Sequence, residues 1–303
     1  MSTIAEKLQI ILNAKTAIKS AIEAKGVSDV GDKIENYATK IGEISGSSSE
    51  YSDLDGMIYS LSTITEFPEG WKFAPRSGKN CVKMFSTCKS LTTIPQLDTT
   101  KGTDFYEMFY YCSSLTTIPQ LDTSSGTNFR DMFSDCTNLT TIPQLDTSSG
   151  TSFRDMFSNC TNLSTIPQLD TSSGTAFLYM LFGCTNLTAI PQLNTTNGTD
   201  FSYMFYQCSS LTAIPQLDTT KGTNFSYMLF GCKSLITLGG FIGLSKSLSL
   251  SYSNNLTHDS LMNVINNLAT VTSSTTLTLG STNLAKLTDE EKKVATDKGW
   301  TLA

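Results

Sequence analysis

The chain has 303 residues, of which 39% are hydrophobic and 16% are charged, and it carries a formal net charge of −6 with a pI of about 4.9. A chain of this length can bury the core of one large domain or two modest ones, and it is too apolar to be intrinsically disordered. The acidic balance excludes the basic surface that binds nucleic acid. No apolar stretch reaches the roughly 18 residues of a membrane-spanning helix, so we expect no membrane span.

Residues 1–44 predict a helical module for attachment or oligomerisation. Aliphatic residues recur at heptad-like spacing between positions 4 and 25, and a Thr3-x-x-Glu6 capping box opens this first helix. After a turn at Gly26, a second apolar pattern continues to Ile44. Two short amphipathic helices cannot cover their apolar faces alone. We therefore expect them to dock onto a larger assembly, or onto copies of the same chain in a dimer or trimer.

Residues 45–60 read as a linker and N-terminal cap, because they begin with a run of serine and glycine. The start of the chain does not show the basic flank and apolar core of a secretory signal. We therefore expect the protein to be made and to mature in a cytosol.

The central feature of the chain is a 24-residue repeat. A methionine and a cysteine recur every 24 residues in six indel-free copies between positions 84 and 227. In the copy that contains residues 105–112, Phe, Met, Phe and Cys have the i, i+3, i+4, i+7 spacing of one face of a short helix. The Thr-rich stretch that follows reads as a strand. We predict an α/β solenoid over 61–240, in which each coil is one strand plus one short helix and the stacked apolar faces form one core.

Three repeated positions invite a closer interpretation. The cysteines could hold a metal, but each stands alone on the apolar stripe without a CxxC partner, which favours buried free thiols. The aspartates could hold calcium, but Asn194 replaces one of them, and this change preserves a hydrogen-bonded turn while weakening a calcium site. A glycine in each copy, such as Gly150, is expected to supply a positive φ. We therefore predict no metal and no cofactor. The acidic ladder consists of Asp98, Asp122, Asp146, Asp170 and Asp218.

Catalysis has little support in the sequence. His258 is the one histidine, which excludes histidine-clustered metal sites and most triads, and its surroundings predict a polar helix start. Phosphate-binding glycine motifs do not occur. The acidic ladder repeats one environment, whereas glycoside hydrolysis needs two carboxylates in unlike environments. We predict a protein that is not an enzyme and has no catalytic residues.

The positions that vary between copies point outward, and aromatic residues gather there. Three successive copies each carry an i, i+3 aromatic pair, and these pairs should stack into an exposed strip. Such a strip commonly marks a binding surface. In the two preceding copies the same surface carries Arg130-Asp131 and Arg154-Asp155. The candidate ligand-binding residues are Tyr179, Phe182, Tyr203, Tyr206, Tyr227 and Phe230, with Tyr106, Tyr110 and Tyr111 nearer the N-terminus.

Two other interpretations of the strip stay open. The rings could form a contact between copies of the chain. Alternatively, Phe182 and Phe230 could partly fill the core, because Leu181 and Leu229 stand where other copies have phenylalanine.

Residues 241–303 predict larger strand-helix coils that cap the C-terminal end of the core. A helix carries Leu261, Val264 and Ile265 on one stripe, and a strand follows at 276–279. A final helix is opened by a capping box from Thr288 to Glu291 and ends before Trp300.

The repeat L-x-x-I-P-x-L-D-T-S-x-G-T-x-F-x-x-M-F-x-x-C resembles the leucine-rich repeats of the BspA-like surface-protein family over about residues 61 to 240. Members of that family are cell-surface adhesins, which implies a binding scaffold. The opening segment through Ile44 and the closing segments at 255–268 and 284–291 resemble parts of virion fibre and tail-associated proteins of phages of gut bacteria.

Together these resemblances imply a phage virion protein, assembled in the host bacterial cytoplasm, that is attached to other virion proteins through residues 1–44. Its solenoid would recognise a host surface protein or glycan. The alternative is a bacterial cell-surface adhesin of the BspA-like family that lacks its export signal.

Overall fold

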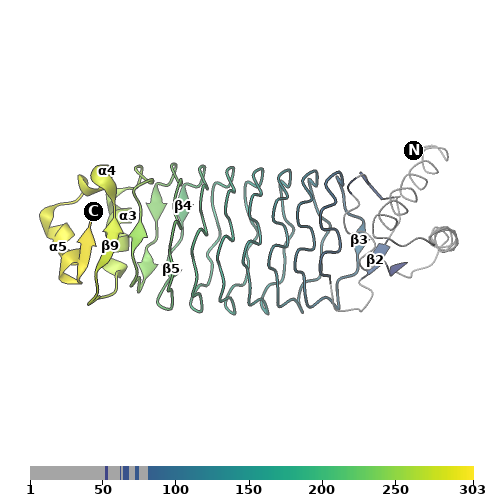
Figure 1. The fold of residues 1–303 in the computed structure, drawn as a ribbon, viewed down its shortest axis with the longest axis horizontal. Helices are drawn as coiled ribbons and strands as arrows, with labels where there is room; N and C mark the ends of the chain where they lie inside the picture. The colour runs from purple at the N-terminus through teal and green to yellow at the C-terminus, as the bar shows by residue number, and fades with distance from the viewer. Residues whose placement is uncertain (1–51, 54–61, 63, 68–71, 75–80) are drawn as a thin grey trace, which may run out of the picture.

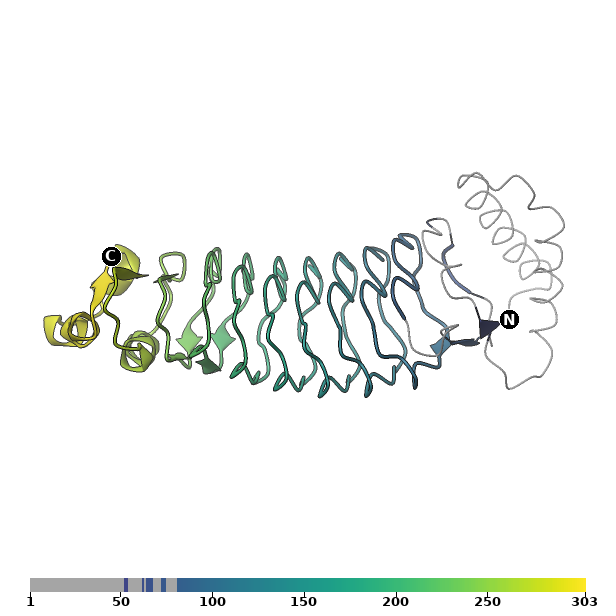
Figure 2. The same cartoon turned by 60° about the horizontal axis from the view of Figure 1, so that its bottom comes forward.

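The repeats stack into a solenoid, as the constant period predicts. The computed structural model describes residues 52–53, 62, 64–67, 72–74 and 81–303. The coils lie side by side along one long axis, and the helices of the described residues gather at the C-terminal end (Figures 1 and 2). The predicted helical module at 1–44 lies outside the described residues, as does the linker apart from its residues 52–53.

The strands of the solenoid are short and parallel. They are β1 (Ser52–Asp53), β2 (Lys72–Ala74), β3 (Gln96–Leu97), β4 (Ala213–Ile214), β5 (Leu217–Asp218), β6 (Thr237–Leu238) and β7 (Phe241–Ile242). The pairs are β1 with β2, β2 with β3, β4 with β6 and β5 with β7. Pro215 separates β4 from β5, because proline has no N–H to donate to a ladder. Single β-bridges between residues 24 apart join the other coils, for example Asn128 to Ser152. Between Leu97 and Ala213 the Thr-rich stretch predicted as a strand in each coil is extended chain without an assigned strand, so that part of the prediction is wrong for these coils.

The segment predicted as a short helix in each coil is a series of tight turns instead. The N–H of Met108 donates to the carbonyl of Phe105 (3.2 Å), and the alternate amides donate to the next coil, as Phe109 does to Met132 (2.9 Å). An α-helix would bond all its amides within one coil. The same four apolar side chains are still fully buried, so the prediction of the buried face is confirmed and the prediction of the helix is wrong.

Two ladders of stacked phenylalanine rings fill the core. One runs from Phe105 to Phe225 with ring centroids 5.3–5.9 Å apart, and the other runs from Phe85 to Phe157. The repeated glycine makes room for these rings. A Cβ on Gly150 would lie 2.8 Å from Cζ of Phe153 and 2.9 Å from Cε2 of Phe129. The predicted positive φ is wrong, because none of the repeated glycines adopts it.

The repeated cysteines are buried free thiols, and each packs into the seam between coils. Sγ of Cys136 donates to the carbonyl of Phe109 (3.0 Å), and the same contact recurs from Cys112 to Cys232. Burial raises the pKa of the Cys136 thiol to about 12, so it stays protonated and can keep donating. This arrangement agrees with the structural interpretation of the cysteines.

The acidic ladder forms turns, as the sequence favours. Oδ1 of Asp122 accepts hydrogen bonds from the N–H (3.1 Å) and the hydroxyl (2.7 Å) of Ser124, and the hydroxyl bond lowers the pKa of the Asp122 carboxyl. Asn194 makes the equivalent bond to the N–H of Thr196 (3.2 Å). The turn therefore survives the change from aspartate to asparagine.

Parallel strands continue into the C-terminal coils, where helices appear. The elements are β8 (Leu248–Ser249), α3 (His258–Asn267), β9 (Thr275–Thr278), α4 (Gly280–Leu284), α5 (Asp289–Asp297) and β10 (Trp300–Leu302), with the sheet order β10-β9-β8. The predicted capping box between Thr288 and Glu291 is present at the start of α5. His258 lies at the start of α3, where its Nε2 contacts Oε1 of Glu291 (2.8 Å) and links the two helices.

Candidate functional site

The six C-terminal aromatic residues form two parallel columns of stacked rings, which we call the aromatic strip. The first column is Tyr179, Tyr203 and Tyr227, with centroids 4.6 and 5.1 Å apart. The second column is Phe182, Tyr206 and Phe230, with centroids 4.8 and 5.0 Å apart. Within each coil the two rings also touch, at 5.4–6.0 Å. The stacking predicted from the i, i+3 pairs is therefore present in the structure.

The backbone of the tight turns places the first column. Tyr179, Tyr203 and Tyr227 have φ of 56°, 57° and 55°, the left-handed region that side chains other than Asn and Asp seldom adopt. The chain adopts the same conformation at this position in each coil from Lys83 to Tyr227, so these side chains leave the solenoid in the same direction. Hydrogen bonds such as that from the Tyr203 N–H to the Ser226 carbonyl (2.9 Å) keep successive rings in register.

Because the rings are stacked, the strip presents mainly ring edges and tyrosine hydroxyls to solvent. The interplanar angles are 14° and 24° in the first column and 5° and 8° in the second. Five of the six side chains are half-buried by their neighbours, whereas Tyr227 at the end of its column is 57% exposed. Partial burial and the neighbouring Tyr203 raise the pKa of the Tyr179 hydroxyl, so it remains a donor at neutral pH.

Phe182 and Phe230 belong to the strip and not to the core. Leu181 and Leu229 are almost fully buried and occupy the core position, whereas both phenylalanines stay half-buried against their partners in the second column. The structure therefore does not support the exchange of core side chains that the sequence left open.

The three tyrosines nearer the N-terminus lie apart from the strip. Tyr106 contacts Lys83 and Arg130 at 5.5 and 5.3 Å from its ring, and a hydrogen bond with Glu107 raises its pKa to about 12. Tyr110 and Tyr111 touch each other at 6.1 Å, and Lys89 lies over Tyr111. Between these three tyrosines and the strip lie two coils that have Asp131 and Asp155 at the first-column position and serine at the second-column position. The structure thus divides the nine predicted residues into two groups.

One ring of the strip, Tyr252, could not be recognised from the repeat pattern of the sequence. It extends the second column with its centroid 4.1 Å from that of Phe230, and it is 45% exposed. It stands 22 residues after Phe230 because the coil that follows Cys232 is shorter on this side of the solenoid, as the hydrogen bonds from the Ser253 hydroxyl to the Cys232 carbonyl and from the Thr257 N–H to the Ile236 carbonyl show. The only sequence signal was an aromatic residue two positions short of the expected register.

In the charged coils, Asp131 occupies the position of the strip tyrosines, and we predict that replacing it with asparagine stabilises the protein at pH 7.5. Burial, followed by the neighbouring Asp155, raises the pKa of Asp131 to about 6, although Arg130 partly offsets this. The folded state therefore binds this proton more tightly than the unfolded chain, and stability falls as the pH rises from about 4 to 6.

Asp131→Asn removes that loss and tolerates the positive φ of 55°. Urea denaturation should show a gain of about 2 kcal/mol at pH 7.5 that disappears near pH 4. A loss of stability at pH 7.5 would show that the Arg130 ion pair outweighs the burial of the carboxylate.

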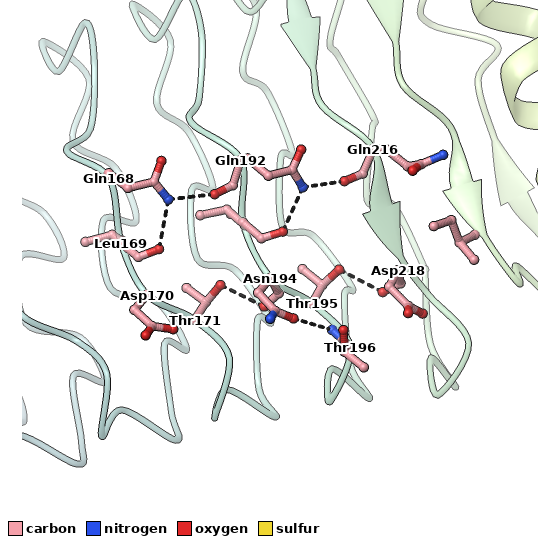
Figure 3. Close-up of a pocket in the computed structure, with 12 residues that line it drawn as sticks. Gln168, Leu169, Asp170, Thr171, Gln192, Asn194, Thr195, Thr196, Gln216 and Asp218 are labelled. Carbon is pink, nitrogen blue, oxygen red and sulfur yellow. Dashed lines mark hydrogen bonds between the residues drawn. The ribbon is translucent and has the colours of Figure 1, made fainter.

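A second surface, a polar groove of about 580 Å³, follows the Gln-Leu-Asp segment of the coils (Figure 3). Nε2 of Gln192 donates to the carbonyls of Leu193 (3.0 Å) and Gln216 (2.7 Å), and the hydroxyl of Thr195 donates to the Asp218 carbonyl (2.7 Å). These donors already bind neighbouring coils, and the same bonds recur along the solenoid. The groove is therefore explained by the scaffold, whereas the strip is not.

Among the residues that the structure describes, no group of three or more His, Cys, Asp or Glu side chains is placed to hold a metal ion. No helix in this part of the chain has the length and apolar character that a membrane span requires.

Comparison with known proteins adds a family. Residues 79–189 and 140–238 match the family described as "Mycoplasma protein of unknown function, DUF285", and together they cover more than half of the chain. No curated protein matches the chain. Among solved structures, the crystal structure of a T. pallidum leucine-rich-repeat protein aligns with 78% of this chain and 84% of its own, at 15% identity and a TM-score of 0.26.

Proposed function

The chain belongs to the DUF285 family, with repeats of the BspA-like leucine-rich type, and from this premise we propose that it is a non-enzymatic recognition protein that binds a cell-surface ligand through the aromatic strip. The family description assigns no activity, so the proposal rests on the surface itself.

The difference between scaffold and strip carries the proposal. Core positions are nearly identical from coil to coil, and so are the hydrogen bonds that join the coils. The strip has aromatic side chains at both positions in three successive coils, where the two preceding coils have Asp131, Asp155, Ser134 and Ser158. These tyrosines also occupy a strained backbone position, which costs about 1–2 kcal/mol for an ordinary residue. Folding alone does not require rings there, whereas binding surfaces are commonly enriched in tyrosine.

We propose a phage particle as the carrier of this surface. The support is the resemblance of residues 1–44 and of the closing segments to virion fibre and tail-associated proteins. A bacterial cell-surface adhesin is the second candidate, and the family match over residues 79–238 favours it. Mass spectrometry of purified phage particles and of shaved bacterial surfaces separates the two, since each candidate predicts the chain in one fraction only.

The binding proposal is tested with the full chain and the variant Tyr203→Asn/Tyr206→Ser. Asparagine tolerates the positive φ at the first position, and serine is the residue that other coils carry at the second. Binding to intact bacteria and to a glycan array should fall at least about tenfold, because the centre of the strip is lost.

The matched control is Glu107→Asn/Tyr110→Ser, which makes the same residues at the same two positions of a distant coil. We expect it to bind like the parent, with circular dichroism showing equal folding. If both variants bind like the parent, the strip is not the recognition site. If the strip variant instead turns an oligomer into a monomer in sedimentation, the strip is a subunit contact and the proposal is wrong.

A further inference from the structure

The first column of the strip stops one ring short of the second. Tyr252 continues the second column beyond Phe230. The residue three positions before Tyr252 is Ser249, a small exposed residue at the end of β8 that has strand backbone in place of the positive φ of the first column and lines the space beside Tyr227. The two columns together therefore have seven rings and one vacant corner.

That corner is a hollow with a volume of about 240 Å³. Its lining residues are Tyr227, Met228, Phe230, Ser249 and Tyr252. One face of the Tyr227 ring is covered by Tyr203, and the side chain is still 57% exposed at this end of the column. The hollow thus offers the one uncovered ring face at the C-terminal end of the first column.

The lining defines the chemistry of an occupant. None of the five lining residues is charged, which disfavours an ionic ligand. The face of an aromatic ring carries partial negative charge and attracts polarised C–H groups. Hydroxyl groups of Tyr227 and Tyr252 can donate or accept hydrogen bonds around the rim. The Ser249 hydroxyl, which already bonds to the Ser251 hydroxyl (3.0 Å), keeps capacity to accept one more. The volume is below the roughly 300 Å³ at which sites for drug-sized ligands begin, so it suits a single ring.

We propose that the hollow binds one pyranose ring of a carbohydrate, which stacks its C–H face on Tyr227 and continues the first column. A pyranose has the required apolar face, a rim of hydroxyls and no charge. Tyr227 and Tyr252 are exposed, so a pyranose bound between them stays open to solvent. The bound pyranose can therefore be one unit of a longer glycan. This inference deepens the proposed function and rests on it for its biological meaning.

The test compares the full chain with two variants in saturation-transfer NMR. The probes are the methyl glycosides of glucose, galactose, mannose and N-acetylglucosamine, with phenol as a planar aromatic probe. We expect at least one methyl glycoside to bind. Ser249→Tyr places a ring in the vacant corner and Tyr227→Asn removes the open face, so each should weaken binding by at least about tenfold.

Asp155→Tyr is the matched control, because it lengthens the first column at its other end. Asp155 has φ of 54°, close to the 56° of the adjacent Tyr179, so the new ring can stack there. This variant should keep the affinity of the parent for the glycoside. Circular dichroism and thermal melting check that all variants fold.

The outcomes separate this inference from the proposed function. Glycoside binding that Ser249→Tyr leaves unchanged overturns the hollow as the site. If phenol binds and no methyl glycoside does, the proposal that the occupant is a carbohydrate is wrong. If no glycoside binds while the full chain still binds cells through the strip, the inference is wrong and the proposed function stands. If glycosides bind in the hollow but strip variants bind cells like the parent, the proposed function fails and the hollow remains a sugar site.

Discussion

Replacing Phe153 with alanine is expected to lower the free energy of unfolding by about 3–5 kcal/mol. Phe153 is fully buried and lies between Phe129 and Phe177, with ring centroids 5.9 and 5.8 Å away. The substitution removes the buried apolar surface of the Phe153 side chain and both of its stacking contacts. It also leaves a cavity in the middle of the phenylalanine ladder. The hydrogen bonds between coils oppose collapse around that cavity.

The matched comparison is Phe157→Leu in the second ladder. The chain itself places leucine at this position in other coils, at Leu181 and Leu229, so the substitution should cost less than about 1.5 kcal/mol. Urea denaturation followed by circular dichroism measures both. Because solenoid coils are coupled mainly to their neighbours, hydrogen exchange should show the loss of protection concentrated in the coils that flank Phe153. Equal costs for the two variants would contradict the tight packing of the first ladder.

Gly150→Ala is expected to cost about 1–3 kcal/mol even though its φ suits alanine. The new Cβ would lie 2.8 and 2.9 Å from two stacked rings and 2.9 Å from the carbonyl oxygen of Thr147, which belongs to the backbone. Neither ring can retreat freely, because each is itself stacked on a neighbour. Thermal melting compares this variant with Ser149→Ala on the exposed part of the same turn, which should change stability by less than about 0.5 kcal/mol. If Gly150→Ala melts at the same temperature as the parent, the phenylalanine rings can shift enough to accommodate the new Cβ.

The sequence predicts the periodic part of this fold well, because a constant period leaves few ways to bury repeated apolar side chains. The sequence does not predict which backbone hydrogen bonds the segment around Phe105 makes. The spacing that buries Phe105 and Cys112 on one face is shared by an α-helix and by consecutive turns, and the choice depends on carbonyls 23 residues further along the chain. The role of Gly150 is also not evident from the sequence, since the rings that it accommodates come partly from the preceding coil.

The aromatic strip also has a part that the sequence predicts and a part that it does not. Its first six rings could be predicted, because the i, i+3 aromatic pairs recur at the constant 24-residue period. Tyr252 and the hollow beside Ser249 could not, because the shortened coil changes the register after residue 232, and only the structure shows which residue follows Phe230 in the column.

The uniform seam between coils has a consequence for how such a protein evolves. Every coil from Phe105 to Phe201 donates the same backbone, cysteine and threonine hydrogen bonds to neighbours of identical length. A recombination event that duplicates or deletes one whole coil would therefore leave each remaining junction intact, because any coil fits on any other. Surface residues can then be inserted, removed or moved along the rod as units. The ligand preference of such a lineage can change by shuffling coils, without any new solution to the packing of the core.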